Sequence, residues 1–305
     1  GEGGADRDHW DLAAEFRPNA QITATSSLLY NKAINNNLRS LTLAQMAASG
    51  TKLDFGTAIP QHLAAGAGAQ KETTPADGYY KFNINPFENY LWTSKLEYAP
   101  QANLRVSAEP YFWYGFGTGG SQLSTLAEAS ATNKLGGGVR DINGDGDVLD
   151  TVMVYRSSVT RTYRPGITLK GNYSGGNHNL LAGVWYERAR HIQTNPAVRF
   201  DNSGVPASLW LNDPAAFLRR IDGSVQQNRE WFTLNTASSV FVQDSINLMQ
   251  DKLNLQLGLR ESRIERDFTN TANDGSTSTT GRSDGNYEIK RSYSKLLPSA
   301  AVRYT

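Results

Sequence analysis

The chain has 305 residues, with 30 Lys and Arg against 29 Asp and Glu, so its formal net charge is +1. This balance gives no overall attraction to polyanions, and we expect no nucleic-acid partner. The absence of cysteine excludes disulfides, thiolate metal sites and cysteine catalysis. The longest apolar stretch, about seven residues from Leu180 to Tyr186, is far shorter than the ~18 residues of a membrane-spanning helix.

Apolar and polar residues alternate through most of the chain, which is the two-residue period of β-strands. In chain order, the predicted strands cover residues 10–16, 21–31, 87–98, 104–116, 163–173, 180–186, 231–248, 253–260 and 295–304. Residues 121–131 are the one segment where we expect a short helix. We predict an all-β protein.

The connections between the predicted strands alternate between short and long. Short turns cover residues 17–20, 99–103, 174–177 and 249–252, and long polar segments cover 32–86, 117–150, 190–229 and 267–290. Transmembrane β-barrels have short periplasmic turns and long extracellular loops. In a soluble β-sandwich, nothing comparable requires short and long loops to alternate along the chain.

Aromatic residues stand at the strand ends next to the short turns. Phe16, Tyr98, Tyr173 and Tyr304 lie on the apolar face there, whereas Leu248 is the exception. Aromatic rings prefer the membrane interface, so we interpret this row as an aromatic girdle. Aromatic residues favour strands in general, but that preference does not explain their common position.

The opposite face of the strands is polar and charged. Its members include Lys95, Glu97, Arg105, Glu109, Arg164, Lys170, Gln256 and Arg260. Such charges suit an aqueous lumen and are costly in a packed core. The pattern therefore predicts an antiparallel, up-and-down transmembrane β-barrel segment.

Nine strands is an odd number, whereas bacterial single-chain barrels have even numbers. One explanation is a missed strand within 32–86 or 151–160, which would make ten. Val152, Val154 and Tyr155 are alternatively expected to extend the strand that reaches Tyr173. We favour a third explanation, that the chain is part of a larger barrel.

The C-terminal third contains sequence motifs that are typical of one protein family. Residues 241–244 read F-V-Q-D, and after a short turn residues 253–260 read L-N-L-Q-L-G-L-R. Tyr293–Ser299 followed by Val302-Arg303-Tyr304 continues the pattern, and the acidic loop Asp141–Asp150 has a composition common in the family's extracellular loops. The chain resembles TonB-dependent outer-membrane receptors, in overall pattern throughout and in motif over about 243–305.

The resemblance implies a barrel of about 22 strands with a plugged lumen. It also implies uptake of a scarce, large solute across the outer membrane of a Gram-negative bacterium, most often a ferric siderophore and sometimes haem, cobalamin or an oligosaccharide. The energy would come from the TonB complex acting on a plug domain. We find no plug domain, coupling box or terminal aromatic strand in this sequence. Residues 1–305 are therefore expected to form the middle portion of the receptor barrel, in contact with outer-membrane lipid.

The acidic loop contains a candidate calcium site. Asp141, Asn143 and Asp145, followed by Gly146, match the first half of a calcium-binding loop. Val152 occupies the twelfth position, where a bidentate carboxylate is usual, and Asp147 or Asp150 is the candidate replacement. The alternative is a solvated acidic turn. We predict no other cofactor.

Four residues of the lumen-facing side are candidate ligand contacts for an anionic or aromatic solute. They are Arg105, Tyr111, Trp113 and Arg164. The equally supported alternative is a polar network that stabilises the lumen wall.

No catalytic constellation is present, so we do not expect an enzyme. Residues 115–120 match G-x-G-x-x-G, but the preceding strand alternates charged with apolar residues, unlike the buried parallel strand of a dinucleotide site, and we expect a flexible loop. The four histidines show no zinc-binding spacing. The competing functions are a passive porin, which has no plug domain, and a secreted all-β carbohydrate-binding protein, which needs no detergent.

Overall fold

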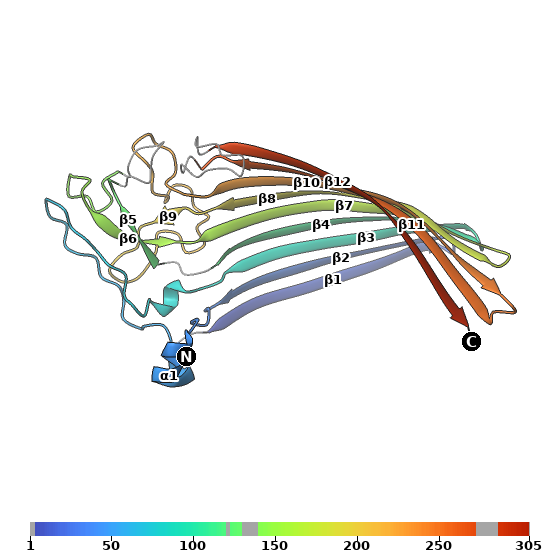
Figure 1. Cartoon of the computed structure of the whole chain (residues 1–305), viewed down its shortest axis with the longest axis horizontal. Coiled ribbons are helices and arrows are strands. Elements are labelled where there is room, and N and C mark those ends of the chain that lie inside the picture. The colour runs from blue at the N-terminus through green and yellow to red at the C-terminus, as the bar shows by residue number, and fades with distance from the viewer. Residues whose placement is uncertain (1–3, 120–122, 130–139, 273–285, 305) are drawn as a thin grey trace.

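The computed structural model describes residues 4–119, 123–129, 140–272 and 286–304. Nine strands form one antiparallel sheet in the order β1-β2-β3-β4-β7-β8-β10-β11-β12 (Figure 1). Their bounds are β1 Ala5–Asn19, β2 Ile22–Asn35, β3 Phe87–Gln101, β4 Leu104–Gly119, β7 Ser158–Gly175, β8 His178–Thr194, β10 Glu230–Leu248, β11 Leu253–Asn270 and β12 Tyr287–Tyr304. The nine predicted strands and their up-and-down order are confirmed.

The long connections hold a second, smaller sheet and short helices. The sheet consists of β5 (Leu123–Ala127), β6 (Thr151–Arg156) and β9 (Ala197–Val198), and the helices are α1 (Leu43–Ser49), η1 (Gly50–Lys52) and η2 (Tyr80–Phe82). These elements gather at one end of the long sheet, and the tight turns lie at the other end (Figure 1). No helix of the described residues is long and apolar enough to cross a membrane.

Three local predictions are wrong. Residues 123–127 form strand β5 instead of part of a helix, and residues 115–119 belong to β4 instead of a flexible loop, while Gly120 lies outside the described residues. Residues 151–156 do not extend β7, because they pair with β5 and β9 in the small sheet. The segment 32–86 adds no further strand to the large sheet after β2 ends at Asn35. The sheet is open, with β1 and β12 at its edges, as expected for part of a larger barrel.

The sheet has an apolar face and a polar face, and the apolar face is exposed. On it, Leu257 is 52% exposed, Tyr98 42%, Tyr173 46% and Tyr304 71%. The buried apolar side chains lie mainly at the loop end, in two clusters around Tyr155 and Val154. Over the described residues, no second layer covers the apolar face, which is what contact with lipid requires.

The strand register aligns a second aromatic row on the apolar face, toward the loop end. Trp10, Tyr30, Tyr90, Tyr114 and Tyr163 are successive cross-strand partners on β1, β2, β3, β4 and β7. Neighbouring tyrosine rings lie 4.8 Å, 6.1 Å and 5.1 Å apart. Tyr90 and Tyr98 mark the two rows on β3, and eight residues at about 3.3 Å each separate them by about 26 Å. This separation matches the apolar band of a membrane barrel, which is about 25 Å tall.

Candidate functional site

The polar face of β3, β4 and β7 carries a ladder of ion pairs. The Glu97 carboxylate lies 2.6 Å from Lys95 Nζ and 3.1 Å from Arg105 Nε. Lys170 on β7 pairs with Glu109 on β4 at 2.9 Å. Arg105, predicted as a ligand contact, is thus already paired with a carboxylate, although its side chain is 60% exposed.

Glu187 on β8 is the centre of a second polar group. Tyr111 Oη donates to Glu187 Oε2 at 2.6 Å, and Arg164 Nη2 donates to both carboxylate oxygens at 3.0 Å. Trp185 Nε1 donates to Tyr111 Oη at 3.2 Å. Because Glu187 is 7% exposed, its charge depends on these partners. These side chains are hydrogen-bonded to one another, as in a polar network that stabilises the lumen wall. Contact of Tyr111 and Arg164 with a ligand stays a prediction.

Trp113 lies on the same face but outside this network. Its ring packs close to Gly115, and its centroid is 6.5 Å from that of Phe87. The structure therefore joins Tyr111 and Arg164 through Glu187, and leaves Arg105 and Trp113 in separate surroundings. Glu187 and Trp185 were not among the predicted site residues, although strand alternation along β8 places both on this face.

Residues 141–150 form a tight acidic loop. The Asp141 carboxylate accepts hydrogen bonds from the backbone N–H of Gly144 at 2.5 Å and of Gly146 at 2.9 Å. These backbone donors, Gly146 first, lower the pKa of Asp141. Asn143 Oδ1 accepts from the Asp145 N–H, and Asp145 Oδ1 accepts from the Asp147 N–H. Many of these side-chain oxygens therefore accept hydrogen bonds from the backbone of the loop itself.

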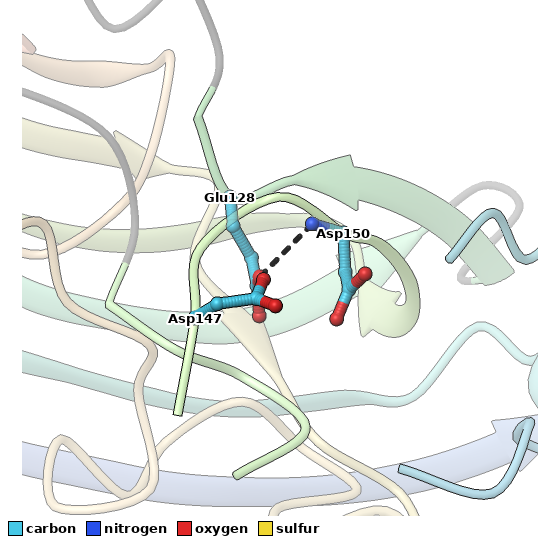
Figure 2. A group of neighbouring side chains, drawn as sticks. All are labelled: Glu128, Asp147 and Asp150. Carbon is cyan, nitrogen blue, oxygen red and sulfur yellow. Dashed lines mark hydrogen bonds between the residues drawn. The ribbon is translucent and has the colours of Figure 1, made fainter. Parts of the chain in front are cut away.

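Three carboxylates converge beside the loop, from Glu128, Asp147 and Asp150 (Figure 2). One oxygen from each lies within 4.8 Å of the others, and Glu128 and Asp150 are 0% and 1% exposed. Glu128 Oε2 accepts from the Asp150 N–H at 3.2 Å, as Figure 2 shows. Over the described chain, no ion pair neutralises the three carboxylates.

This donor set fits a hard cation that prefers oxygen ligands, such as calcium. Among the described residues, the buried Oδ2 of Asp145 has no hydrogen-bond partner, but Asp145 is not part of the converging group, whose carboxylate oxygens all accept N–H hydrogen bonds. Only Asp147 and Asp150 of the five predicted residues belong to the converging group. Glu128 was missed because it lies far upstream, outside the loop motif. Calcium binding stays a prediction.

The loops are packed together by buried polar contacts. The Glu72 carboxylate accepts from the Leu63 N–H at 2.8 Å and from the Met153 N–H at 2.6 Å, and it pairs with His62 Nδ1 at 3.0 Å. His62 also contacts the Phe200 backbone oxygen at 3.0 Å. The first, second and third long connections are thereby tied into one unit at the end of the sheet.

Together these features define a class of protein. One face of the sheet is apolar and exposed between two aromatic rows, the other face is polar and ion-paired, and long loops pack at one end. This is the wall of a transmembrane β-barrel of the outer-membrane type.

The model of the family "TonB dependent receptor-like, beta-barrel" matches residues 16–305. The chain belongs to this family.

Solved structures with the same fold include two receptors and a transporter. The siderophore receptor PiuA from Acinetobacter baumannii is 17% identical, with 99% of this chain and 40% of that chain covered and a TM-score of 0.54. The ferric citrate transporter FecA is 14% identical (99% and 34% covered, TM-score 0.54), and the ferric yersiniabactin uptake receptor FyuA from Yersinia pestis is 8% identical (99% and 35% covered, TM-score 0.51). The chain therefore spans well under half the length of these proteins. No curated protein sequence matches it significantly.

Proposed function

We propose that the chain is part of the barrel wall of a receptor in the outer membrane of a Gram-negative bacterium. The receptor takes up a large, scarce solute, in the first instance a ferric siderophore or a similar iron complex. The energy comes from TonB, acting on a plug domain that residues 1–305 do not contain. The observation that carries this proposal is the family match over residues 16–305, on a sheet whose apolar face is exposed.

Two features support a receptor over the alternative functions. The uncovered apolar face argues against a secreted carbohydrate-binding protein, which would leave such a surface in water. The family and the similar solved structures are transport receptors, which argues against both a passive porin and an enzyme. PiuA, FecA and FyuA are named for a siderophore, ferric citrate and ferric yersiniabactin, which supports iron as the cargo.

Uptake by whole cells tests the proposal. The full-length receptor is expressed in a strain without other iron receptors, and radiolabelled iron is supplied as a hydroxamate, a catecholate or a citrate complex. We expect saturable accumulation of one complex, and loss of that accumulation when either the receptor or TonB is deleted. Accumulation that persists without TonB and rises linearly with concentration would indicate a passive pore instead.

A further inference from the structure

Three arginines from different loop segments converge near the polar face of β10. We call Arg156, Arg220 and Arg229 the arginine cluster. Arg156 Nη2 donates to Asn228 Oδ1 at 2.8 Å, and Arg220 Nη2 donates to the Gln227 backbone oxygen at 2.8 Å. Two guanidinium groups thus hold the residues that immediately precede the third.

Within the part of the chain that the structure describes, the arginine cluster has no carboxylate partner. Among the described residues, none of the three arginines forms an ion pair within 4.0 Å, although Arg220 is only 2% exposed. Asp222 is affected by Arg220, but its carboxylate is hydrogen-bonded by Ser224, which is the main cause of its lowered pKa. Burial, and then Arg220 and Arg229, lower the pKa of Arg156. Because arginine stays protonated in proteins, the mutual repulsion remains until an anion offsets it.

Two buried N–H donors, one in the arginine cluster and one beside it, lack an acceptor among the described residues. They are Arg220 Nε and Trp231 Nε1. The Trp231 ring lies under the Arg229 guanidinium, 4.6 Å from its central carbon to the ring centroid. Trp231 is on the polar face, since its partners Gln193 and Asn270 have the same orientation as Glu187 and Arg260. Unpaired donors next to uncompensated positive charge point to a negatively charged acceptor.

The polar face of β10, β11 and β12 extends this positive charge along the barrel wall. By strand alternation, it carries Arg260, Arg266, Arg291, Lys295 and Arg303 and no Asp or Glu on these three strands. Arg266 and Arg291 are direct cross-strand partners. Like charges at such positions destabilise a sheet, so a structural role does not explain them. A cationic wall attracts anionic solutes from a distance.

We propose that the arginine cluster, with Trp231, binds an anionic group of the solute that enters the barrel. The inference rests on the proposed function and specifies its substrate class. The fitting ligand chemistry is a carboxylate or phosphate oxygen pair, because a planar guanidinium donates two parallel N–H bonds to such groups. The polar-face position of Trp231 assigns the site to the transported solute and not to membrane lipid.

Binding to the purified full-length receptor tests this assignment. Citrate and inorganic phosphate serve as probes in calorimetric titrations in neutral detergent. The double variant Arg156→Gln/Arg229→Gln removes the accessible part of the arginine cluster. We expect its affinity for citrate to fall about 10- to 100-fold, the effect of losing charge-assisted hydrogen bonds. The matched control Arg219→Gln changes an exposed neighbour whose guanidinium contacts Gly223 and Pro214 carbonyls, and it should stay within about twofold of wild type.

Melting temperatures distinguish a loss of citrate binding from a loss of folding of the receptor. Citrate should raise the melting temperature of the wild type and of Arg219→Gln, but not of the double variant. The measured quantity is the shift that citrate produces in each protein, because without citrate the double variant relieves repulsion between like charges but also loses the hydrogen bonds of Arg156 to Asn195 and Asn228 and of Arg229 to Ser158. Wild-type receptor that binds neither probe, or a double variant that binds citrate normally, would overturn the inference. Displacement of bound citrate by anionic phospholipid would also overturn the inference, because the site would then bind membrane lipid.

Different experimental results would refute the anion site and the proposed function. Citrate binding that needs the arginine cluster, in a receptor without TonB-dependent uptake, would refute the proposed function and leave the anion site intact. TonB-dependent uptake that proceeds at the wild-type rate in the double variant would refute the anion site and leave the proposed function intact.

Discussion

Glycine positions on the polar face make room for aromatic rings of neighbouring residues. A Cβ at Gly166 would overlap the Tyr111 ring, and a Cβ at Gly115 would overlap the Trp113 ring. Both rings therefore lie flat along the wall instead of projecting from it. This arrangement also sets the position from which Tyr111 reaches Glu187.

The variant Gly166→Ala tests this packing. The added methyl group would displace the Tyr111 ring and weaken its hydrogen bond to Glu187, at a cost of about 1–3 kcal/mol in the free energy of unfolding. The matched control on the same strand is Gly171→Ala, where the nearest atom is Val106 Cγ1 at 3.8 Å. Urea titration of the receptor in lipid vesicles measures both. Equal stability of the two variants would contradict the packing argument.

Removal of calcium tests the carboxylate group at Glu128, Asp147 and Asp150. If calcium binds there, EGTA should lower the melting temperature of the wild-type receptor, and calcium should restore it. Asp147→Asn should abolish this response, since it removes one of the three charges. Asp201→Asn changes an exposed loop carboxylate outside the group and serves as the control. A wild-type melting temperature that does not depend on calcium would exclude the site.

For the predicted site residues, the sequence indicates the face on which a side chain lies but not the residue that it contacts. Alternation correctly placed Arg105, Tyr111 and Arg164 on the polar face, because side-chain direction in a strand follows from position. It did not identify Glu187 as the shared partner of Tyr111 and Arg164, or Glu97 as the partner of Arg105, since partner choice depends on the register between strands. Glu128 reaches Asp150 only through tertiary packing of the loops, which no local pattern encodes.

At the scale of elements, lipid-facing strands were predictable and loop strands were not. The strands of the large sheet have one apolar and one polar face, which gives a strong two-residue period. Strand β6 has no such period, because Val152, Met153, Val154 and Tyr155 are all buried, between 0% and 4% exposed. A continuous apolar run does not reveal which sheet it joins. The sequence therefore left open whether this segment forms a further strand or extends β7, and the structure shows a separate strand in the small sheet.

Charge placed on the two faces of β11 should have opposite outcomes. Leu257→Arg puts a cation on the exposed apolar face opposite Asp244, and we expect a cost below the ~2–4 kcal/mol of a cation at the middle of the membrane, because the Asp244 carboxylate offsets part of it. Gln256→Arg, one residue away, places the same group on the polar face and should be tolerated. Heat-modifiable migration in gels and unfolding from vesicles report both. A folded yield of Leu257→Arg equal to that of Gln256→Arg would contradict the lipid-facing assignment.

At the scale of the whole molecule, the wall and the loops are stabilised by different means. The wall depends on hydrogen-bonded strands and lipid contact, whereas the loops have a buried core around Tyr155, Phe82 and Val198, to which the wall contributes Phe116 and Val159 at the loop ends of β4 and β7. Tyr155 also donates from Oη to the Leu209 carbonyl at 2.9 Å. We therefore expect the loop unit to open without disassembly of the wall.

Truncation of the loop core tests this independence. Tyr155→Ala should destabilise the loop unit by about 3–5 kcal/mol, as for other buried aromatic residues. Limited proteolysis should then cut within the loops while the barrel keeps its heat-modifiable migration. Tyr155→Phe removes only the hydroxyl and should remain largely resistant to protease. Loss of the folded barrel in Tyr155→Ala would show that the two parts are coupled.

The two edges of the sheet have a consequence for assembly in the membrane. Each of β1 and β12 presents one side of its backbone without a neighbour in the described sheet. Hydrocarbon offers no donors or acceptors, so every amide left open there carries a penalty of several kcal/mol. An open sheet of this kind is therefore costly in hydrocarbon, and β1 and β12 each need a hydrogen-bonded neighbour before the wall can be stable in the membrane.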